Sequence, residues 1–333
     1  PPRSTLDRSS AASDVYKRQL ISLCRVCNLR ILLLIFISFN CASDPSFGEI
    51  EELIFKSDYD ERKIQIYFPG NKIINTNTTF IIMNDGEELF NAGDSWHNKE
   101  WGIDEKLKEL SATEYNFNFV IIAVDSAKKG QGLFIDETKR YAEYFPKEAI
   151  DYFENGLKKR LYQRYINQEN LQYLDFLIRD LIPFLEGKFM TKLDNKNLGI
   201  IGASMGGLSA LNALLENPEK FKFAGCISTH WVGIKPSSYL LLPITQNVYG
   251  DKNTTNAIIK YVEQNIDNLA DQKVYFDHGT EGLDSLYEIP QKRVDSIFEE
   301  NTKEFKSLIF EGEDHDAPFF GGRIDYVLNY LMN

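Results

Sequence analysis

The chain has 333 residues, and its 37 Lys and Arg against 49 Asp and Glu give a formal net charge of −12. Hydrophobic residues make up 43% and charged residues 26%, a globular composition that excludes a largely disordered chain. The acidic balance argues against nucleic acid as the main partner, because phosphate binding needs concentrated Lys and Arg. Four cysteines are too few for a disulfide scaffold, and Cys24 and Cys27 lack the second ligand pair of a zinc site.

The first 43 residues predict a leader outside the fold. Residues 1–19 are polar without apolar periodicity, and we interpret them as linker or adaptor sequence. Residues 20–43 read as a signal peptide, because a basic stretch precedes an apolar run at 31–39 that is far shorter than the ~20 residues of a membrane span. Cys41 lies where a bacterial lipoprotein is cleaved and lipidated; cleavage after Ser43 and a buried N-terminal helix are the alternatives. We therefore expect an exported bacterial protein, periplasmic or anchored to the membrane through Cys41.

The rest of the chain alternates short apolar runs with helical patterns. Strands are predicted at 61–69, 78–85, 118–125, 197–204, 221–229, 273–280 and 305–313. Helices are predicted at 104–111, 165–188, 206–216, 254–269, 288–301 and 322–331, with Pro183 bending the second. This alternation predicts one α/β domain from about 48 to 333, built on a doubly wound, mostly parallel sheet with helices on both faces.

The sharpest motif is Gly202-Ala203-Ser204-Met205-Gly206, which fits the G-x-S-x-G nucleophile elbow. An apolar strand pattern precedes it and an Ala- and Leu-rich helix pattern follows, as the elbow requires. A glycine-rich structural turn is the alternative. The context favours Ser204 as a nucleophile presented above the sheet on strained backbone.

A serine nucleophile needs a histidine base, which in this order of motifs follows the serine. His97 precedes Ser204, His230 closely follows a predicted strand and could line the pocket, and His278 falls inside one. His315 follows the last predicted strand and precedes the last helix, which makes it the candidate base.

The orienting acid is expected in the loop HGTEGLDSLY after the preceding strand. Asp284 and Glu281 both qualify, and Asp284 is favoured. No metal or organic cofactor is implied by these residues.

Several segments together resemble a known family: MNDGEELF at 83–90, WGIDE at 101–105, RYAEYFP at 140–146, GASMGG at 202–207 and GEDHDAPFF at 312–320. They are similar to the esterase D-like branch of the α/β-hydrolases, which includes feruloyl, acetylxylan and enterochelin esterases and S-formylglutathione hydrolases. The resemblance runs from about 60 to 331. It implies an oxyanion hole made by the backbone N–H groups of Glu87 and Met205. The chain departs from the family pattern at Asn84 and Glu87 and in the spacing of the acid loop.

The resemblance and the motifs predict a serine carboxylic-ester hydrolase that acts through an acyl-enzyme on a small or aromatic acyl ester. An acyltransferase of the same fold and a catalytically silent hydrolase-fold binding protein are the alternatives. Residues 126–165 hold nine Lys or Arg and eight Phe or Tyr, and could form a cap over the site or an ordinary solvated face. Trp96, Trp101, His230 and Trp231 follow predicted strands and could line the substrate pocket or pack in the core.

Overall fold

The computed structural model describes residues 45, 47–57, 61–70, 74–95, 97–113, 115, 117–127, 138–166, 172–233 and 250–333. The chain divides into two compact units, Pro1–Asp44 and Pro45–Asn333, and the second contains all of the described residues. The residues predicted to form the leader and the signal peptide, Cys41 included, therefore lie outside the described residues.

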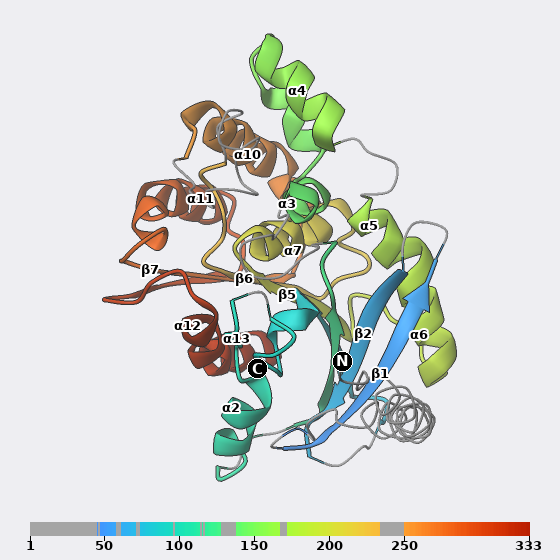
Figure 1. The fold of residues 1–333 in the computed structure, drawn as a ribbon. Helices are drawn as coiled ribbons and strands as arrows, with labels where there is room; N and C mark the ends of the chain where they lie inside the picture. The colour runs from blue at the N-terminus through green and yellow to red at the C-terminus, as the bar shows by residue number, and fades with distance from the viewer. Residues whose placement is uncertain are drawn as a thin grey trace, which may run out of the picture. The chain divides into compact units, whose positions relative to one another are not determined.

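The described residues of the second unit form an eight-stranded sheet in the order β1-β2-β4-β3-β5-β6-β7-β8 (Figure 1). The strands are β1 (Glu49–Lys56), β2 (Glu61–Phe68), β3 (Thr79–Asn84), β4 (Phe119–Val124), β5 (Leu198–Ala203), β6 (Phe223–Ile227), β7 (Lys273–Gly279) and β8 (Phe305–Phe310). The β1–β2 and β2–β4 pairs are antiparallel and the other pairs are parallel. The mostly parallel sheet predicted from the sequence is thus confirmed.

The sequence patterns did not predict β1. Its sequence EIEELIFK carries three glutamates, and its residues are only half-buried or exposed. Because β1 is an edge strand with little burial, it lacks the apolar run that marked the other strands.

The helices are α2 (Ile103–Leu110), α3 (Thr138–Tyr144), α4 (Leu157–Ile166), α5 (Tyr173–Phe176), α6 (Ile182–Phe189), α7 (Met205–Glu216), α10 (Lys252–Asn265), α11 (Glu288–Glu300), α12 (Ala317–Gly322) and α13 (Ile324–Met332). Short 3-10 turns include η1 (Gly86–Glu88), η3 (Glu148–Tyr152), η6 (Ile266–Asn268) and η7 (Asp284–Leu286). Figure 1 shows α3, α7, α10 and α11 on one face of the sheet and α2, α12 and α13 on the other. None of the described helices is long and apolar enough to span a bilayer.

The predicted helix at 165–188 was wrong in its bounds. The sequence folds instead as α4, which ends at Ile166, and then α5, a π-helical turn at Leu177–Leu181, and α6. Pro183 lies in the first turn of α6, which directly follows the π-helical turn. The bend expected at Pro183 stays a prediction.

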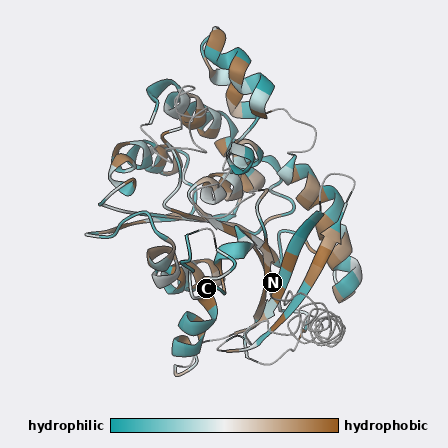
Figure 2. Cartoon of the chain, in the orientation of Figure 1, coloured by the Kyte–Doolittle hydropathy of each residue, from teal (hydrophilic) through white to brown (hydrophobic). Residues whose placement is uncertain are grey.

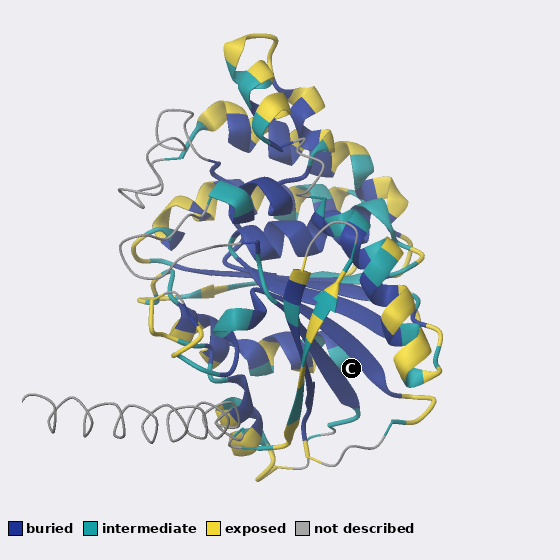
Figure 3. Cartoon of the chain, turned by 45° about the vertical axis from the view of Figure 1, so that its right-hand side comes forward, coloured by how far each residue is buried: buried dark blue, intermediate teal, exposed yellow. Residues whose placement is uncertain are grey.

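Alternating residues of the central strands belong to two separate hydrophobic cores. Phe80 and Ile82 pack with α7, α10 and α11, whereas Ile81 and Met83 pack with α2 and α13. Every residue of β3, β4 and β5 is buried, and Figure 3 shows these strands in dark blue between the helices. In α4, by contrast, hydrophilic and hydrophobic residues alternate, as expected of a helix with one face in solvent (Figure 2).

Candidate active site

Ser204 lies between β5 and α7 on backbone with φ 57° and ψ −122°. This region is rarely adopted by residues other than glycine, so the surrounding structure must hold the serine there. The Ser204 N–H donates to the Ile227 carbonyl at 2.9 Å. A Cβ at Gly202 would lie 2.4 Å from the Gly206 carbonyl oxygen, and one at Gly206 would lie 2.7 Å from Asp85 Oδ2. The tight turn therefore explains both glycines of the motif.

His315 lies between β8 and α12, and its Nδ1 is 2.6 Å from Asp284 Oδ1. Asp284 begins the η7 turn after β7 and is fully buried. Its other oxygen, Oδ2, accepts hydrogen bonds from Ser228 Oγ at 2.6 Å and from the Gly279 N–H at 2.7 Å. Because Nδ1 faces Asp284, Nε2 is the ring nitrogen of His315 that remains to face a reacting group.

The pKa of Asp284 lies below its ordinary value. Burial acts to raise it, but the hydrogen bond and charge of His315, together with the Ser228 and Gly279 donors, outweigh that effect. Asp284 is therefore a carboxylate that can orient an imidazole and stabilise its protonated form.

Glu281, the alternative acid, lies in the same loop but is exposed. Its N–H donates to the Glu313 carbonyl at 3.0 Å, and no contact joins it to His315 among the described residues. The structure thus brings Asp284, and not Glu281, to the imidazole.

The buried Arg323 stabilises the surroundings of the Asp284 carboxylate. Arg323 donates to Ser228 Oγ at 3.0 Å and to Asp277 Oδ1 at 3.1 Å, and its Nε donates to Glu313 at 2.6 Å. Burial raises the pKa of Asp277 to about 6, although Arg323 acts to lower it. The sequence gives no sign of this role for Arg323. Its partners Ser228, Asp277 and Glu313 are brought together by the parallel pairing of β6, β7 and β8.

The turn after β3 faces the start of α7. Asp85 has φ 59°, and its carboxylate receives two hydrogen bonds from Arg140, at 2.5 and 2.7 Å. Arg140 Nη2 also reaches the Ala203 carbonyl at 3.5 Å, so one guanidinium joins the turn to the residue before Ser204. A Cβ at Gly86 would lie 2.7 Å from the Val124 nitrogen, so only glycine fits there.

The two predicted oxyanion-hole residues, Glu87 and Met205, occupy the first turns of η1 and α7. The N–H groups at the start of a helix have no acceptor within it, which leaves the Met205 N–H directed out of α7. The Glu87 carboxylate accepts hydrogen bonds from the N–H of Ser126 at 3.0 Å and from its Oγ at 2.5 Å, which fixes the turn that carries the Glu87 N–H.

Of the predicted pocket residues, His230 lies at the site. Its N–H donates to the Ser204 carbonyl at 3.1 Å, and its Nδ1 lies 3.0 Å from Tyr287 Oη. Burial, together with the charges of His315 and Arg140, lowers the pKa of His230 to about 3, so its imidazole is neutral.

The tryptophans differ in their surroundings. Trp101 packs on Phe320, whose ring in turn packs on His315 with centroids 5.1 Å apart. Trp231 is wholly buried and donates from Nε1 to Gln291 Oε1 at 2.7 Å. Trp231 therefore packs in the core, which was the alternative to lining the pocket. Trp96 lies outside the described residues.

The basic and aromatic segment at 126–165 is only partly described, since 128–137 lie outside the described residues. Most of its described aromatic residues belong to the core, namely Tyr141, Tyr144, Phe145, Phe153 and Tyr162. Within the described ranges, no group of three or more His, Cys, Asp or Glu side chains could hold a metal ion.

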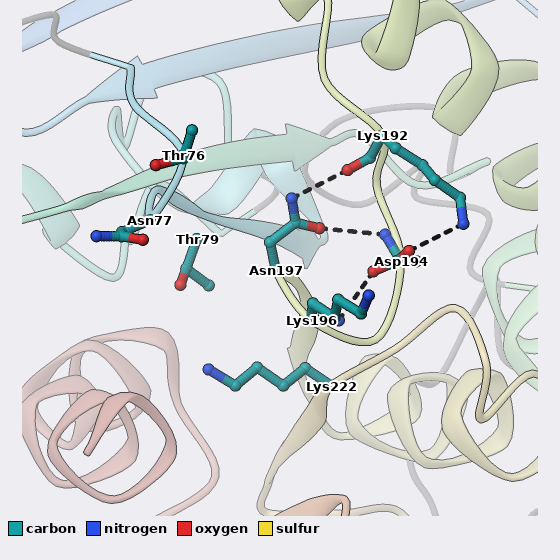
Figure 4. A pocket seen from close by; sticks show the side chains of 8 residues that line it. All are labelled: Thr76, Asn77, Thr79, Lys192, Asp194, Lys196, Asn197 and Lys222. Atoms are coloured by element: carbon teal, nitrogen blue, oxygen red, sulfur yellow. Dashed lines mark hydrogen bonds and ion pairs between the residues drawn. The ribbon is translucent and has the colours of Figure 1, made fainter.

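A hollow of about 600 Å³ lies at the amino ends of the parallel strands, the end of the sheet opposite to Ser204 (Figure 4). Its lining includes Thr79 at the start of β3, and Asn197 and Lys222 before β5 and β6. Asp194 pairs with Lys192 at 3.0 Å, and its N–H donates to Asn197 Oδ1 at 3.1 Å. These contacts stabilise a surface turn, far along the strands from Ser204.

The fold is that of the α/β-hydrolase class. The family model described as "Putative esterase" matches residues 59–323, and the chain therefore belongs to that esterase family. Its members are ester hydrolases, which confirms the predicted family and enzyme class.

Several solved structures share the fold at low sequence identity. A ferulic acid esterase is 14% identical with a TM-score of 0.58, and the match covers 86% of this chain and 98% of that one. An S-formylglutathione hydrolase from Agrobacterium tumefaciens is 14% identical with a TM-score of 0.54, covering 85% and 96%. The enterobactin and salmochelin hydrolase IroE is 15% identical with a TM-score of 0.54, covering 86% and 97%. No curated protein sequence matches the chain.

Proposed function

We propose that this protein is a serine carboxylic-ester hydrolase in which Ser204 is the nucleophile, His315 the base and Asp284 the orienting acid. The observation that carries the proposal is the 2.6 Å hydrogen bond between His315 Nδ1 and a buried, ionised Asp284, in a chain that also holds Ser204 on strained elbow backbone.

The proposed reaction has two halves. Ser204 Oγ attacks the ester carbonyl and His315 Nε2 takes its proton; the tetrahedral intermediate collapses, and the leaving alcohol receives that proton from the imidazolium. Water then attacks the acyl-enzyme with His315 as base, which releases the acid and restores Ser204. Asp284 stabilises the imidazolium in both halves.

The N–H groups of Glu87 and Met205 are the proposed donors to the oxyanion. Removing one such donor typically costs about 10²–10³ in rate, since the donors act where negative charge develops. The bonds that hold the Asp85–Gly86–Glu87 turn are therefore part of the proposed catalytic geometry.

The proposed substrate is a small or aromatic acyl ester. The aromatic rings of Trp101 and Phe320 on the His315 side of the site support it, and two of the similar structures are named for ferulic acid and enterobactin. Acyl transfer to an alcohol uses the same acyl-enzyme and is the second candidate. A silent binding protein is less well supported, because Ser204, His315 and Asp284 are all present.

Covalent labelling by a fluorophosphonate tests the proposal. We expect labelling at Ser204 and hydrolysis of p-nitrophenyl acetate, both abolished in Ser204→Ala, while Ser209→Ala on the same helix keeps both. Hydrolysis that persists in a folded Ser204→Ala variant would contradict the assignment. A screen over acetyl, feruloyl, catecholate and thioester substrates, with and without added alcohol, would then distinguish substrate class and acyl transfer.

We also propose that the protein is exported, on the sequence pattern of residues 20–43 alone, with Cys41 as the candidate for lipidation. Fractionation of a bacterial host and the mass of the N-terminal peptide test this. A membrane-bound form that becomes soluble in Cys41→Ser supports a lipoprotein, whereas an uncleaved cytosolic protein contradicts export.

A further inference from the structure

A buried tyrosine from the acid loop reaches the candidate nucleophile. Tyr287 comes one short turn after Asp284, and its N–H donates to the Asp284 carbonyl at 2.9 Å. Its side chain is wholly buried at the start of α11. The loop after β7 therefore brings both a carboxylate and a phenol to the same site.

The phenol of Tyr287 contacts both histidines of the site. Its hydroxyl lies 3.0 Å from His230 Nδ1, and its ring packs edge to face against the His315 ring, with centroids 5.7 Å apart. The Ser204 hydroxyl is also a hydrogen-bonding neighbour of Tyr287, and acts to lower a phenol pKa that burial and Asp284 raise well above its usual value.

The hydrogen bonds of the Tyr287 hydroxyl join neutral groups. Both Tyr287 and His230 are neutral at ordinary pH, because burial raises the pKa of the phenol and lowers that of the imidazole. The Tyr287 hydroxyl therefore lies between the Ser204 hydroxyl and His230 Nδ1 as a neutral hydrogen-bonding group.

His230 holds this chain of hydrogen bonds at both ends. Its side chain fixes the Tyr287 hydroxyl, and its N–H fixes the Ser204 carbonyl at 3.1 Å. The rotation of the Ser204 side chain is thus limited by a second set of contacts, distinct from the His315–Asp284 pair. A neutral phenol cannot serve as the base, so its effect is on the orientation of the serine hydroxyl.

We propose that Tyr287, fixed by His230, is a positioning residue that orients the Ser204 hydroxyl for attack on the ester. The inference rests on the proposed esterase function. It adds a second set of contacts to the site. His315 takes the serine proton, and Tyr287 holds the serine oxygen before the proton leaves.

Tyr287→Phe is the direct test, because it removes the hydroxyl and keeps the ring against His315. We expect kcat for p-nitrophenyl acetate to fall about tenfold, KM to stay within about twofold, and the rate of fluorophosphonate labelling at Ser204 to fall in parallel with kcat; tenfold corresponds to ~1.4 kcal/mol. Parallel losses in two reactions of Ser204 are not expected from a change in stability alone.

Tyr261→Phe is the matched control. Tyr261 is a buried phenol on α10 whose hydroxyl lies 2.6 Å from both Asn212 Oδ1 and Glu216 Oε1. Its loss should lower the thermal midpoint as much as Tyr287→Phe does, without changing kcat or the labelling rate.

Two substitutions of His230 test the hydrogen-bond chain. Asn has a side-chain amide that can hydrogen-bond to the Tyr287 hydroxyl in place of Nδ1, whereas Leu has no polar group. We expect His230→Asn to keep a larger share of kcat and of the labelling rate than His230→Leu at a temperature where both are folded. Equal losses in the two variants would contradict the role given to the hydrogen bond between His230 and Tyr287.

The outcomes separate the inference from the proposed function. If the wild-type protein hydrolyses esters and is labelled at Ser204, and Tyr287→Phe does both at the wild-type rate, only the inference is overturned. If the wild-type protein does neither, the proposed function fails and the inference fails with it.

Discussion

At the scale of single residues, the candidate site depends on hydrogen bonds to one buried carboxylate, that of Asp284. Asp284 is fully buried, and all three of its donors, from His315, Ser228 and Gly279, lie within 2.7 Å of one of its oxygens. A buried carboxylate with this many donors stays ionised, which is the state that the proposed mechanism needs.

Exchanging the two candidate acids for amides tests this assignment. We expect Asp284→Asn to lower kcat by several orders of magnitude, since the imidazole loses the carboxylate that sets its tautomer and stabilises its charge. Glu281→Gln removes an exposed carboxylate from the same loop and should leave kcat within about twofold. Steady-state kinetics on p-nitrophenyl acetate decide the matter, and the reverse pattern would move the role of the acid to Glu281.

Chain order alone left this choice open. Asp284 and Glu281 are three residues apart in one loop, and only the η7 turn directs the first inward. Arg140 and Tyr287 could not be assigned their roles from the sequence either, because their partners Asp85 and His230 lie 55 and 57 residues away. Ser204 and His315 were accessible to sequence reasoning because their roles follow from local motifs at strand ends.

At the scale of elements, α3 joins the two turns that carry the proposed oxyanion donors. Arg140 on α3 holds Asp85 after β3 and reaches the Ala203 carbonyl before Ser204. A second buried pair on α3, Glu143 with Arg62, ties the helix to β2 instead. Both are buried arginine–carboxylate pairs, but the first holds the turn after β3 and the second holds β2.

This difference gives a matched prediction. Arg140→Lys keeps the charge but loses the two-pronged contact with Asp85, so we expect kcat to fall by about 10–100-fold as the turn loosens. Both variants should lower the free energy of unfolding by ~1–3 kcal/mol, but Arg62→Lys should leave kcat almost unchanged. Thermal unfolding and steady-state kinetics of both variants provide the check. An equal loss of kcat in the two would show that α3 acts only through stability.

At the scale of the whole molecule, the strands β2 to β8 and the mostly parallel sheet were predictable, because buried parallel strands are short apolar runs. The additional edge strand β1 and the bounds of α4 and α5 were not, since both depend on tertiary packing and not on a continuous pattern. The net charge of −12 also gave no sign that some carboxyl groups are buried with raised pKa values.

Asp125, just after β4, makes the stability of the whole domain depend on pH. Burial and the charge of Glu87 raise its pKa to about 8, with Asp94 adding to this and Lys63 and Arg62 acting against it. Its Oδ1 has no hydrogen-bond partner among the described residues. The folded protein therefore keeps a proton on Asp125 that the unfolded chain has already lost above about pH 4.

The sign of the effect follows from this difference. Because the folded state binds more protons, its free energy of unfolding should fall as pH rises, by roughly 2 kcal/mol from Asp125 between pH 6 and 8. Asp125→Asn, which cannot ionise, should remove most of that fall. Asp267→Asn, at an exposed position after α10, is the control and should keep the wild-type slope. Urea unfolding of the three proteins at several pH values measures the slopes; a wild-type slope in Asp125→Asn would mean that Asp125 is already ionised in the folded protein.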